Sequence, residues 1–301
     1  MPTTLHEMQF EILPYAEADR GVVFGIGCDV SVNGEGGFKP GGPDWYVEDS
    51  DNPSNGAKQF GRDHTLATMW QWDLHVNRDQ VGNALKSLGE LATAWRGRMI
   101  RDEIGAALCI RYQLGGRTRR VYGRPRRFEY SPDNLILGGF IPAAADFQCS
   151  DAQTYDDEWS IVTMGMEVAP TGGLVFPTIF PDTTLPGASR DATAVVSGDE
   201  ETYPVIRFDG PLTNPALETA DWSLSLDMTI ANGEYVEIDT RPWAQTVLLN
   251  GSNSVAGALG KRQWLSSASL QPGTTDFIFT GSASSAGAQC EVRWRSAWNS
   301  I

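Results

Sequence analysis

Ten arginines gather in one short stretch of an acidic chain. The 301 residues carry 23 Lys and Arg against 38 Asp and Glu, a formal net charge of −15. Between Arg96 and Arg127 the ten arginines are offset only by Asp102 and Glu103, which leaves +8 in this window and −23 in the rest of the chain. Guanidinium groups bind carboxylates and phosphates through paired hydrogen bonds, so this window is the first candidate for chemistry.

Six of these arginines are expected on a β-hairpin that turns at Gly115-Gly116. They are Arg117, Arg119, Arg120, Arg124, Arg126 and Arg127. With Tyr122, Phe128 and Tyr130 available for stacking they could grip a nucleic acid, but an acidic chain as a whole repels polyanions. The carboxylates of a second copy of this acidic chain are a better partner for these arginines than nucleic-acid phosphates. Head-to-tail contacts between such copies can close a ring. We therefore predict a subunit interface here; a solvated strand and nucleic-acid binding remain the alternatives.

The chain shows no pattern typical of an enzyme. It contains no GxSxG sequence, and its three histidines have no Ser or Cys partner at an informative spacing. The acidic run Asp156–Glu158 precedes Trp159, yet a glycosidase needs two carboxylates held across a sugar cleft, and acidic runs are common in any acidic chain. We predict that the protein is not an enzyme and has no catalytic residues.

Metal and cofactor sites are not predicted either. Asp49-Ser50-Asp51 begins like a calcium loop, but Pro53 and Ser54 stand where a ligand and the turn glycine belong. Gly25-Ile26-Gly27 lacks the third glycine and the following helix of a dinucleotide loop. The four cysteines form no CxxC pair and are expected to be reduced thiols: Cys28, Cys109, Cys149 and Cys290.

Membrane insertion and secretion are also not predicted. No run approaches the ~20 apolar residues that a spanning helix needs. The first residues, MPTTLHEMQFEILPY, have neither the basic nor the apolar part of a secretory signal. We expect a protein made in a cytoplasm, without a membrane partner.

The first half should position the arginine hairpin through one helix and several strands. Val81, Leu85, Leu88, Ala92 and Trp95 recur at spacings of four and three, which predicts a helix over about 79–98 with these side chains on one face. Alternating apolar and polar residues predict strands at 70–76, 108–114 and 117–130. The helix stripe is expected to pack on the sheet that these strands form.

The second half is predicted to be entirely β. Trp222–Ile230 alternates along its whole length, and Asn232-Gly233 predicts a type I′ turn after it. Four prolines and three glycines between residues 170 and 190 favour an extended connector. The predicted organisation is therefore an N-terminal domain at 1–169, a connector at 170–190 and a C-terminal β-sandwich at 191–301.

The order of several short motifs resembles one family over nearly the whole chain. In the first half and the connector they are Phe60-Gly61-Arg62-Asp63, Ala94-Trp95-Arg96, Tyr122–Phe128 and Gly173–Pro177. In the second half they are Gly198-Asp199, Tyr203–Ile206, Asp209–Pro215, Leu224–Ile230, Asn232–Glu234, Ile238–Thr240, Val247–Gly251, Trp264, Leu270–Gly273 and Trp294-Arg295. This order resembles the distal tail (Dit) group of minor tail proteins in long-tailed phages, especially those of actinobacteria.

The resemblance implies a fold and a role that composition does not. It implies a mainly β protein with one significant helix, in which an N-terminal α+β, β-barrel-like domain forms a ring and a galectin-like antiparallel β-sandwich follows. Dit proteins form a homohexameric ring at the distal end of the tail, which joins the major tail tube protein to the tail-associated hub protein of the baseplate. Contact with the tape measure protein is a further expectation. DNA passes the ring only as cargo through its channel, so we expect a structural virion protein.

A tail-tip module that binds glycans of the host envelope is the alternative function. The ten tryptophans could stack on sugar rings, but the alternation predicts that Trp222 and Trp294 are core residues. Some relatives carry an inserted carbohydrate-binding module. The turn-rich insert Asn33–Asn55 is shorter than a small domain of ~50 residues, so no such module is predicted.

Overall fold

The computed structural model describes residues 3–34, 36–42, 44–77, 81–131, 139–166, 189–283 and 287–299. The chain divides into two compact units, the first made of Met1–Asp157 with Trp298–Ile301 and the second of Glu158–Ala297. Residues 158–166, which were predicted with the N-terminal domain, thus belong to the second unit. Most of the predicted connector at 170–190 lies outside the described residues.

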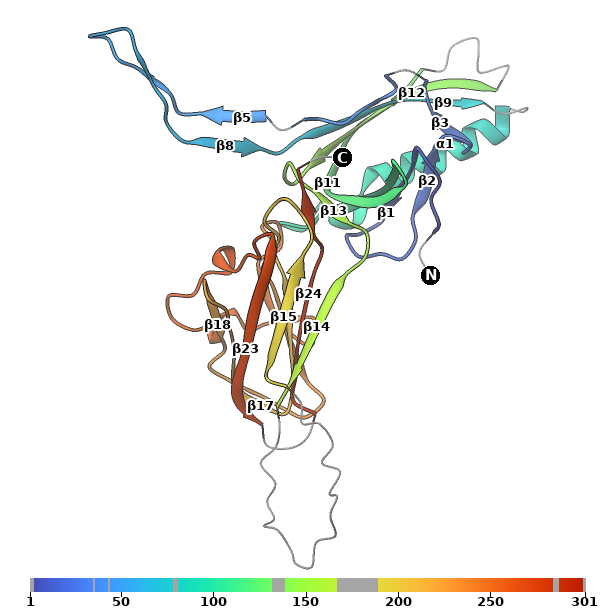
Figure 1. Cartoon of the computed structure of the whole chain (residues 1–301). Helices are drawn as coiled ribbons and strands as arrows, with labels where there is room; N and C mark the ends of the chain where they lie inside the picture. The colour runs from blue at the N-terminus through green and yellow to red at the C-terminus, as the bar shows by residue number, and fades with distance from the viewer. Residues whose placement is uncertain are drawn as a thin grey trace, which may run out of the picture. The chain divides into compact units, whose positions relative to one another are not determined.

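The first unit is built on one large antiparallel sheet (Figure 1). Its strands are β1 (Gln9–Leu13), β2 (Val22–Gly25), β3 (Val30–Val32), β4 (Phe38–Lys39), β9 (Met69–Asn77), β10 (Leu108–Leu114), β11 (Arg117–Tyr130), β12 (Phe140–Cys149), β13 (Thr154–Asp156) and β25 (Ala297–Trp298). The strand order is β2-β1-β10-β11-β12-β9-β3, so the first strands of the chain pair with the arginine hairpin β10–β11. The three strands predicted in this half are confirmed.

Helix α1 (Val81–Arg96) packs on this sheet through an aromatic core and is followed by a short 3-10 turn, η1 (Arg98–Ile100). Trp95 of the helix meets Trp72 of β9 edge to face, with ring centroids 5.6 Å apart. Trp72 in turn meets Phe10 of β1 at 5.6 Å. Edge-to-face contacts of this kind add to the burial of apolar area and fix the helix on the sheet.

The face that α1 buries differs from the predicted stripe. Ala84, Leu88, Leu91 and Trp95 are buried, whereas Leu85 is 43% exposed. We expect Leu91→Ala to lower the free energy of unfolding by about 2 to 5 kcal/mol because it leaves a cavity in the core. Leu85→Ala, the same change one face away, should cost less than about 1 kcal/mol. Urea unfolding of the two variants measures the difference.

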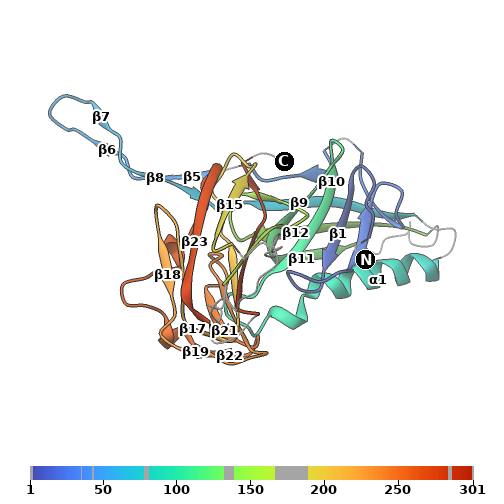
Figure 2. The ribbon, with the colours of Figure 1, turned by 60° about the horizontal axis from the view of Figure 1, so that its bottom comes forward.

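A two-stranded ribbon projects from the first unit between β4 and β9, and we call residues 44–66 the arm (Figure 2). It consists of β5 (Asp44–Val47), β6 (Ser50–Asp51), β7 (Lys58–Gln59) and β8 (Asp63–Leu66). β5 pairs only with β8, and β6 only with β7, within the described residues. The predicted insert Asn33–Asn55 covers only half of this ribbon.

The second unit is a sandwich of two antiparallel sheets. One sheet has the order β14-β24-β16-β20-β21-β22 and the other β15-β23-β17-β18, with β19 beside β17. Their bounds are β14 (Ser160–Gly165), β15 (Asp191–Val196), β16 (Val205–Asp209), β17 (Leu212–Glu218), β18 (Ser223–Ser225), β19 (Thr229–Ile230), β20 (Tyr235–Asp239), β21 (Thr246–Leu249), β22 (Asn253–Ser254), β23 (Gly273–Ala283) and β24 (Gln289–Trp294), with 3-10 turns η3 (Ala256–Ala258) and η4 (Leu265–Ser267). Phe208 of one sheet stacks on Phe279 of the other at 5.8 Å, which places the core between them.

The predicted strand Trp222–Ile230 is interrupted. Only residues 223–225 and 229–230 are strands, and both pair with β17. The turn after it also differs: Gly233 has φ +81° but Asn232 does not have the positive φ that a type I′ turn requires. Trp222 and Trp294 are buried, which confirms that they belong to the core.

The mainly β fold with one significant helix is confirmed for the described part of the chain. No helix among these residues is long and apolar enough to cross a membrane. All four cysteines are free thiols, three of them buried. The described residues also hold no group of three His, Cys, Asp or Glu side chains that could bind a metal ion.

Candidate subunit interface

Two arginines of the predicted interface window face each other across the hairpin. Arg111 of β10 is directly opposite Arg120 of β11 in the register of the sheet. Like charges at such positions repel, so a counterion is needed between them. Asp157 supplies it: its carboxylate accepts two hydrogen bonds from Arg111, at 2.8 and 2.6 Å, and two from Arg120, from Nε at 3.1 Å and from Nη2 at 2.7 Å.

Two further carboxylates contact this pair, Glu11 in the core and Glu17 at the surface. Glu11 lies opposite Arg111 on β1 and forms an ion pair with it, and Glu17 Oε2 lies 3.3 Å from Arg120 Nη1. Burial alone would raise the pKa of Asp157, but the hydrogen bonds and charges of the two arginines outweigh it and hold this pKa below its ordinary value. These arginines are therefore satisfied inside the first unit.

Arg119 and Arg124 also have their contacts within the first unit. Arg119 is buried, and its guanidinium carbon lies 4.6 Å from the ring centroid of Trp298, within the range of a cation–π contact. Arg124 is half-buried and donates from Nε to the carbonyl oxygen of Ala106 at 2.8 Å. Both side chains fix the hairpin in place.

The remaining three predicted interface residues lie at the surface. Arg117 and Arg126 are exposed. Arg127 is half-exposed and its Nε lies 3.0 Å from Asp146 Oδ2. Arg117 also lies over the Trp298 ring, with its guanidinium carbon 5.9 Å from the centroid. Of the six arginines predicted to contact a neighbour, Arg117 and Arg126 are thus the two that are exposed and form no ion pair among the described residues.

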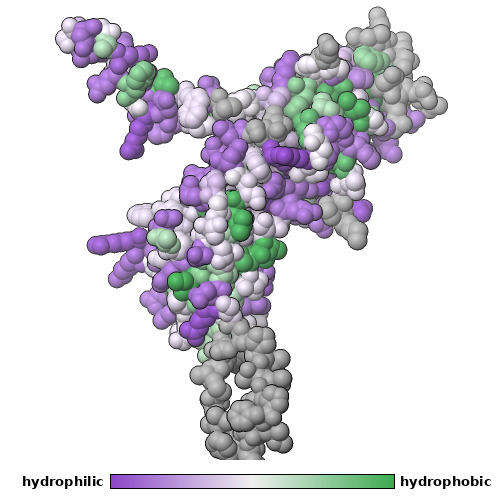
Figure 3. All heavy atoms as spheres, viewed as in Figure 1, coloured by the Kyte–Doolittle hydropathy of each residue, from purple (hydrophilic) through white to green (hydrophobic). Residues whose placement is uncertain are grey.

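The arm was not among the predicted site residues, yet it holds the largest group of exposed apolar side chains in the described part of the first unit. Every described residue of the arm except Asp49 is exposed. Its apolar members are Trp45, Tyr46, Val47, Phe60 and Leu66, with Phe60 81% exposed. In Figure 3 green apolar side chains stand among purple polar ones along the arm. The triplet Trp45-Tyr46-Val47 was the available sequence signal, since aromatic and β-branched residues favour strands.

Charge and turn geometry give the arm an acidic, ordered character. It carries five acids against Lys58 and Arg62, a net charge of −3. Asn52 closes its turn: the Asn52 amide donates to Ala57 O at 2.8 Å, and the Asn52 side chain accepts from the Ser54 amide at 3.0 Å. A two-stranded ribbon without a packed face is at best marginally stable alone, and an exposed apolar patch on it is typical of a contact surface.

Comparison with solved structures shows which known fold this architecture matches. Over 95% of the chain, it superposes with a TM-score of 0.54 on 98% of the phage SPP1 Dit protein, which is described as a paradigm of the hub adsorption apparatus in phages that infect Gram-positive bacteria; the identity is 12%. The chain has the fold of a Dit protein. A chain of the phage P2 baseplate, in its activated conformation with calcium, matches with a TM-score of 0.56 at 9% identity, covering 95% of this chain and 97% of that one.

The Dit fold is confirmed by structure rather than by sequence. The strontium form of the P2 baseplate also matches, with a TM-score of 0.58, 11% identity and coverage of 95% and 97%. No protein-family model and no curated protein matches the chain. Because the match to the Dit protein covers 95% of this chain, the N-terminal sheet with its helix and the C-terminal sandwich are both part of this likeness. The assignment to phages of actinobacteria stays a prediction.

Proposed function

We propose that this protein is a structural component of a phage tail tip, a distal tail protein whose copies form a homohexameric ring. The ring would join the major tail tube protein to the baseplate hub protein, border the tape measure protein, and surround the channel through which DNA passes. The likeness to Dit and baseplate proteins supports the role. The observation that carries the ring is the arm, an exposed apolar ribbon with no partner surface in the described part of its own chain.

The arm is suited to a head-to-tail contact with a second copy. Its apolar side chains and net charge of −3 call for a surface that is apolar and positive. The arginine window offers positive charge at exposed Arg117 and Arg126. A contact between two different surfaces of identical chains repeats from copy to copy and closes a ring when the rotation permits.

The test of this proposal is the particle mass of the purified protein. Native mass spectrometry of the full chain should give a mass of six copies, and negative-stain images should show rings. A protein that stays monomeric at high concentration, and that is missing from tails stained with a specific antibody, would contradict the proposal.

Exposed arginines in the window should make assembly depend on charge. Arg126→Glu is expected to weaken the association of copies by about three- to tenfold, because an exposed ion pair contributes up to ~1 kcal/mol and reversal adds repulsion. Raising the salt concentration should weaken the wild-type ring as well. Sedimentation velocity at low and high salt measures both effects.

Lys86→Glu is the matched control for this change. Lys86 is exposed on α1, outside the arginine window, and its substitution makes the same change of charge. If Arg126→Glu and Lys86→Glu weaken assembly equally, only net charge matters and Arg126 is not at the interface.

A further inference from the structure

The second unit contains a polar pocket that the ring function does not use. It has a volume of about 540 Å³ and lies between two segments of the sandwich: the end of β17 with the turn into β18, and the segment that leads into η4. The residues lining it are Glu218, Thr219, Ala220, Asp221, Trp222, Ser223, Arg262, Gln263, Trp264 and Ser267. Apart from two tryptophans and one alanine, they are polar.

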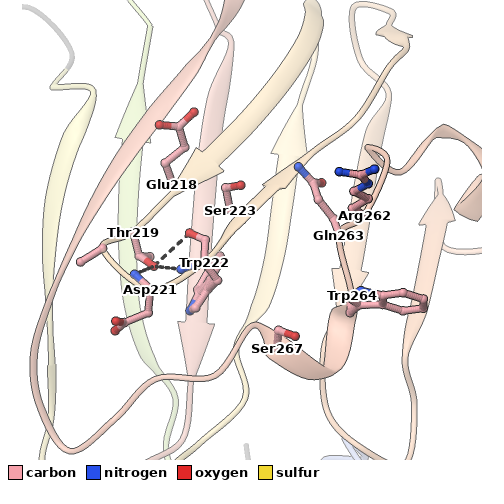
Figure 4. A pocket seen from close by; sticks show the side chains of 10 residues that line it. Glu218, Thr219, Asp221, Trp222, Ser223, Arg262, Gln263, Trp264 and Ser267 are labelled. Carbon is pink, nitrogen blue, oxygen red and sulfur yellow. Dashed lines mark hydrogen bonds between the residues drawn. The ribbon is translucent and has the colours of Figure 1, made fainter.

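The two sides of the pocket carry opposite charges (Figure 4). Glu218 and Asp221 stand on one side, and Arg262 and Trp264 on the other. No described cation pairs with either carboxylate, and no described acid pairs with Arg262. These groups are therefore available to a ligand that can both donate hydrogen bonds and accept them.

The turn that bears the carboxylates is held rigidly. Thr219 Oγ1 accepts a hydrogen bond from the Trp222 amide at 3.1 Å, and the Thr219 amide donates to Trp222 O at 2.9 Å. The Trp222 indole is buried beneath, and its Nε1 donates to Ser269 O at 2.7 Å. The backbone that carries Asp221 is thus ordered before a ligand binds, which lowers the entropy lost on binding.

The opposite side is fixed as well. Gln263 Oε1 accepts from the Ser225 amide at 2.7 Å, and the Gly260 amide donates to Ser225 O at 2.9 Å, so this segment is tied to β18. Arg262 between them has φ +65°, a left-handed conformation that is costly for a residue with a side chain. Such strain is retained where the surrounding structure requires it and is frequent at ligand sites.

Trp264, which lines the pocket, differs in its exposure from the buried tryptophans of the second unit. Its side chain is 70% exposed, whereas Trp222 and Trp294 of the same unit are buried. An indole left in water next to an ordered polar pocket is typical of a contact surface, because an aromatic ring offers a large apolar face with little loss of conformational freedom.

We propose that this pocket binds a saccharide. Sugar hydroxyls donate to Glu218 and Asp221 and accept from Arg262, and the apolar face of a sugar ring covers the Trp264 indole at the rim. A polyphosphate is a poorer match because the two carboxylates would repel it, and a purely apolar ligand would leave charged groups without partners. The proposal concerns the second unit and does not depend on ring formation.

Titration of the full-length protein with free sugars tests this proposal. Saturation-transfer NMR is run with glucose, galactose, rhamnose, N-acetylglucosamine and their short oligomers, and the strongest binder is then titrated by calorimetry. We expect at least one sugar to bind, and Trp264→Ala and Arg262→Ala each to weaken it by about tenfold, as for central residues of other contact surfaces.

The matched controls are Lys261→Ala and Trp243→Ala. Lys261 is the exposed cation next to Arg262, Trp243 is a partly exposed tryptophan of the same unit, and neither lines the pocket. Both variants should bind as the wild type does. Absence of binding to all the sugars at millimolar concentration, or binding that Trp264→Ala and Arg262→Ala leave unchanged, would overturn the proposal.

Discussion

Replacing Trp45 and Phe60 of the arm by aspartate should give a folded protein that no longer assembles. Both side chains are more than half exposed, so their loss should change the free energy of unfolding by less than about 1 kcal/mol. Aromatic anchors at an interface each contribute about 2 kcal/mol or more to association. Loss of both should weaken the contact between copies by about a thousandfold, which light scattering would detect as monomers.

The control for the arm variant is Val195→Asp in the second unit. Val195 is 62% exposed on β15, so this substitution also places a carboxylate on an exposed apolar position. If copies meet through the arm, Val195→Asp keeps the ring and the doubly substituted arm loses it. Rings that survive the double substitution would show that the arm is not a contact between copies.

The strands of the first unit could be predicted because the alternation of apolar and polar residues is visible within each strand. Trp70, Trp72, Leu74 and Val76 alternate with polar residues, and all four are buried in β9. A strand with one face in the core has a period of two that no other element mimics. The strand β9 was therefore predicted within a residue of its observed bounds.

The buried face of α1 could not be chosen from the sequence. Leu88 and Trp95 belong both to the predicted stripe and to the observed one, and the two stripes differ in whether Leu85 or Leu91 completes them. Leu85 and Leu91 are each three residues from Leu88, so they lie about 60° from it on opposite sides of the helix, and either completes an apolar stripe. The position of the sheet decides, and Leu91 is the residue that it covers.

The burial of Arg119 and Arg120 could not be predicted because their partners are distant in sequence. Adjacent residues of a strand point to opposite faces, so burial of both requires that each face of β11 be covered at this point. Glu17 and Trp298, which contact Arg120 and Arg119, lie more than a hundred residues away along the chain. The number of arginines in the window therefore overestimates the positive charge exposed to a partner, because Arg119 and Arg120 are buried.

The arm was not predicted because none of its strands has a buried face. Its strands β5 and β8 have four residues each and bury nothing, so they show no alternation between a core face and a solvent face. A ribbon that buries neither face lacks the pattern on which prediction from one chain depends. The triplet Trp45-Tyr46-Val47 indicated a strand, but not that its side chains would be exposed.

Asp157→Asn should be the most destabilising conservative change in the described part of the first unit. It removes the negative charge between Arg111 and Arg120, which lie opposite each other and are almost wholly buried. Removing one partner of a buried ion pair costs about 3 to 5 kcal/mol, and we expect about 3 because Glu11 and Glu17 remain. Hydrogen exchange of β10 and β11 should quicken accordingly, while β16 and β20 of the second unit stay protected.

The matched control and the pH dependence follow from the same ion pairs. Asp73→Asn removes the carboxylate of an exposed pair, Lys39 with Asp73 at 3.2 Å, and should cost at most about 1 kcal/mol.

Because the pKa of Asp157 is held low in the folded state, its contribution to the free energy of unfolding is complete at neutral pH and is lost as the pH falls through that depressed value. The wild type should therefore exceed Asp157→Asn in stability at pH 7 and lose that advantage in acid below about pH 4. An advantage that persists unchanged in acid would mean that packing, not charge, makes Asp157 important.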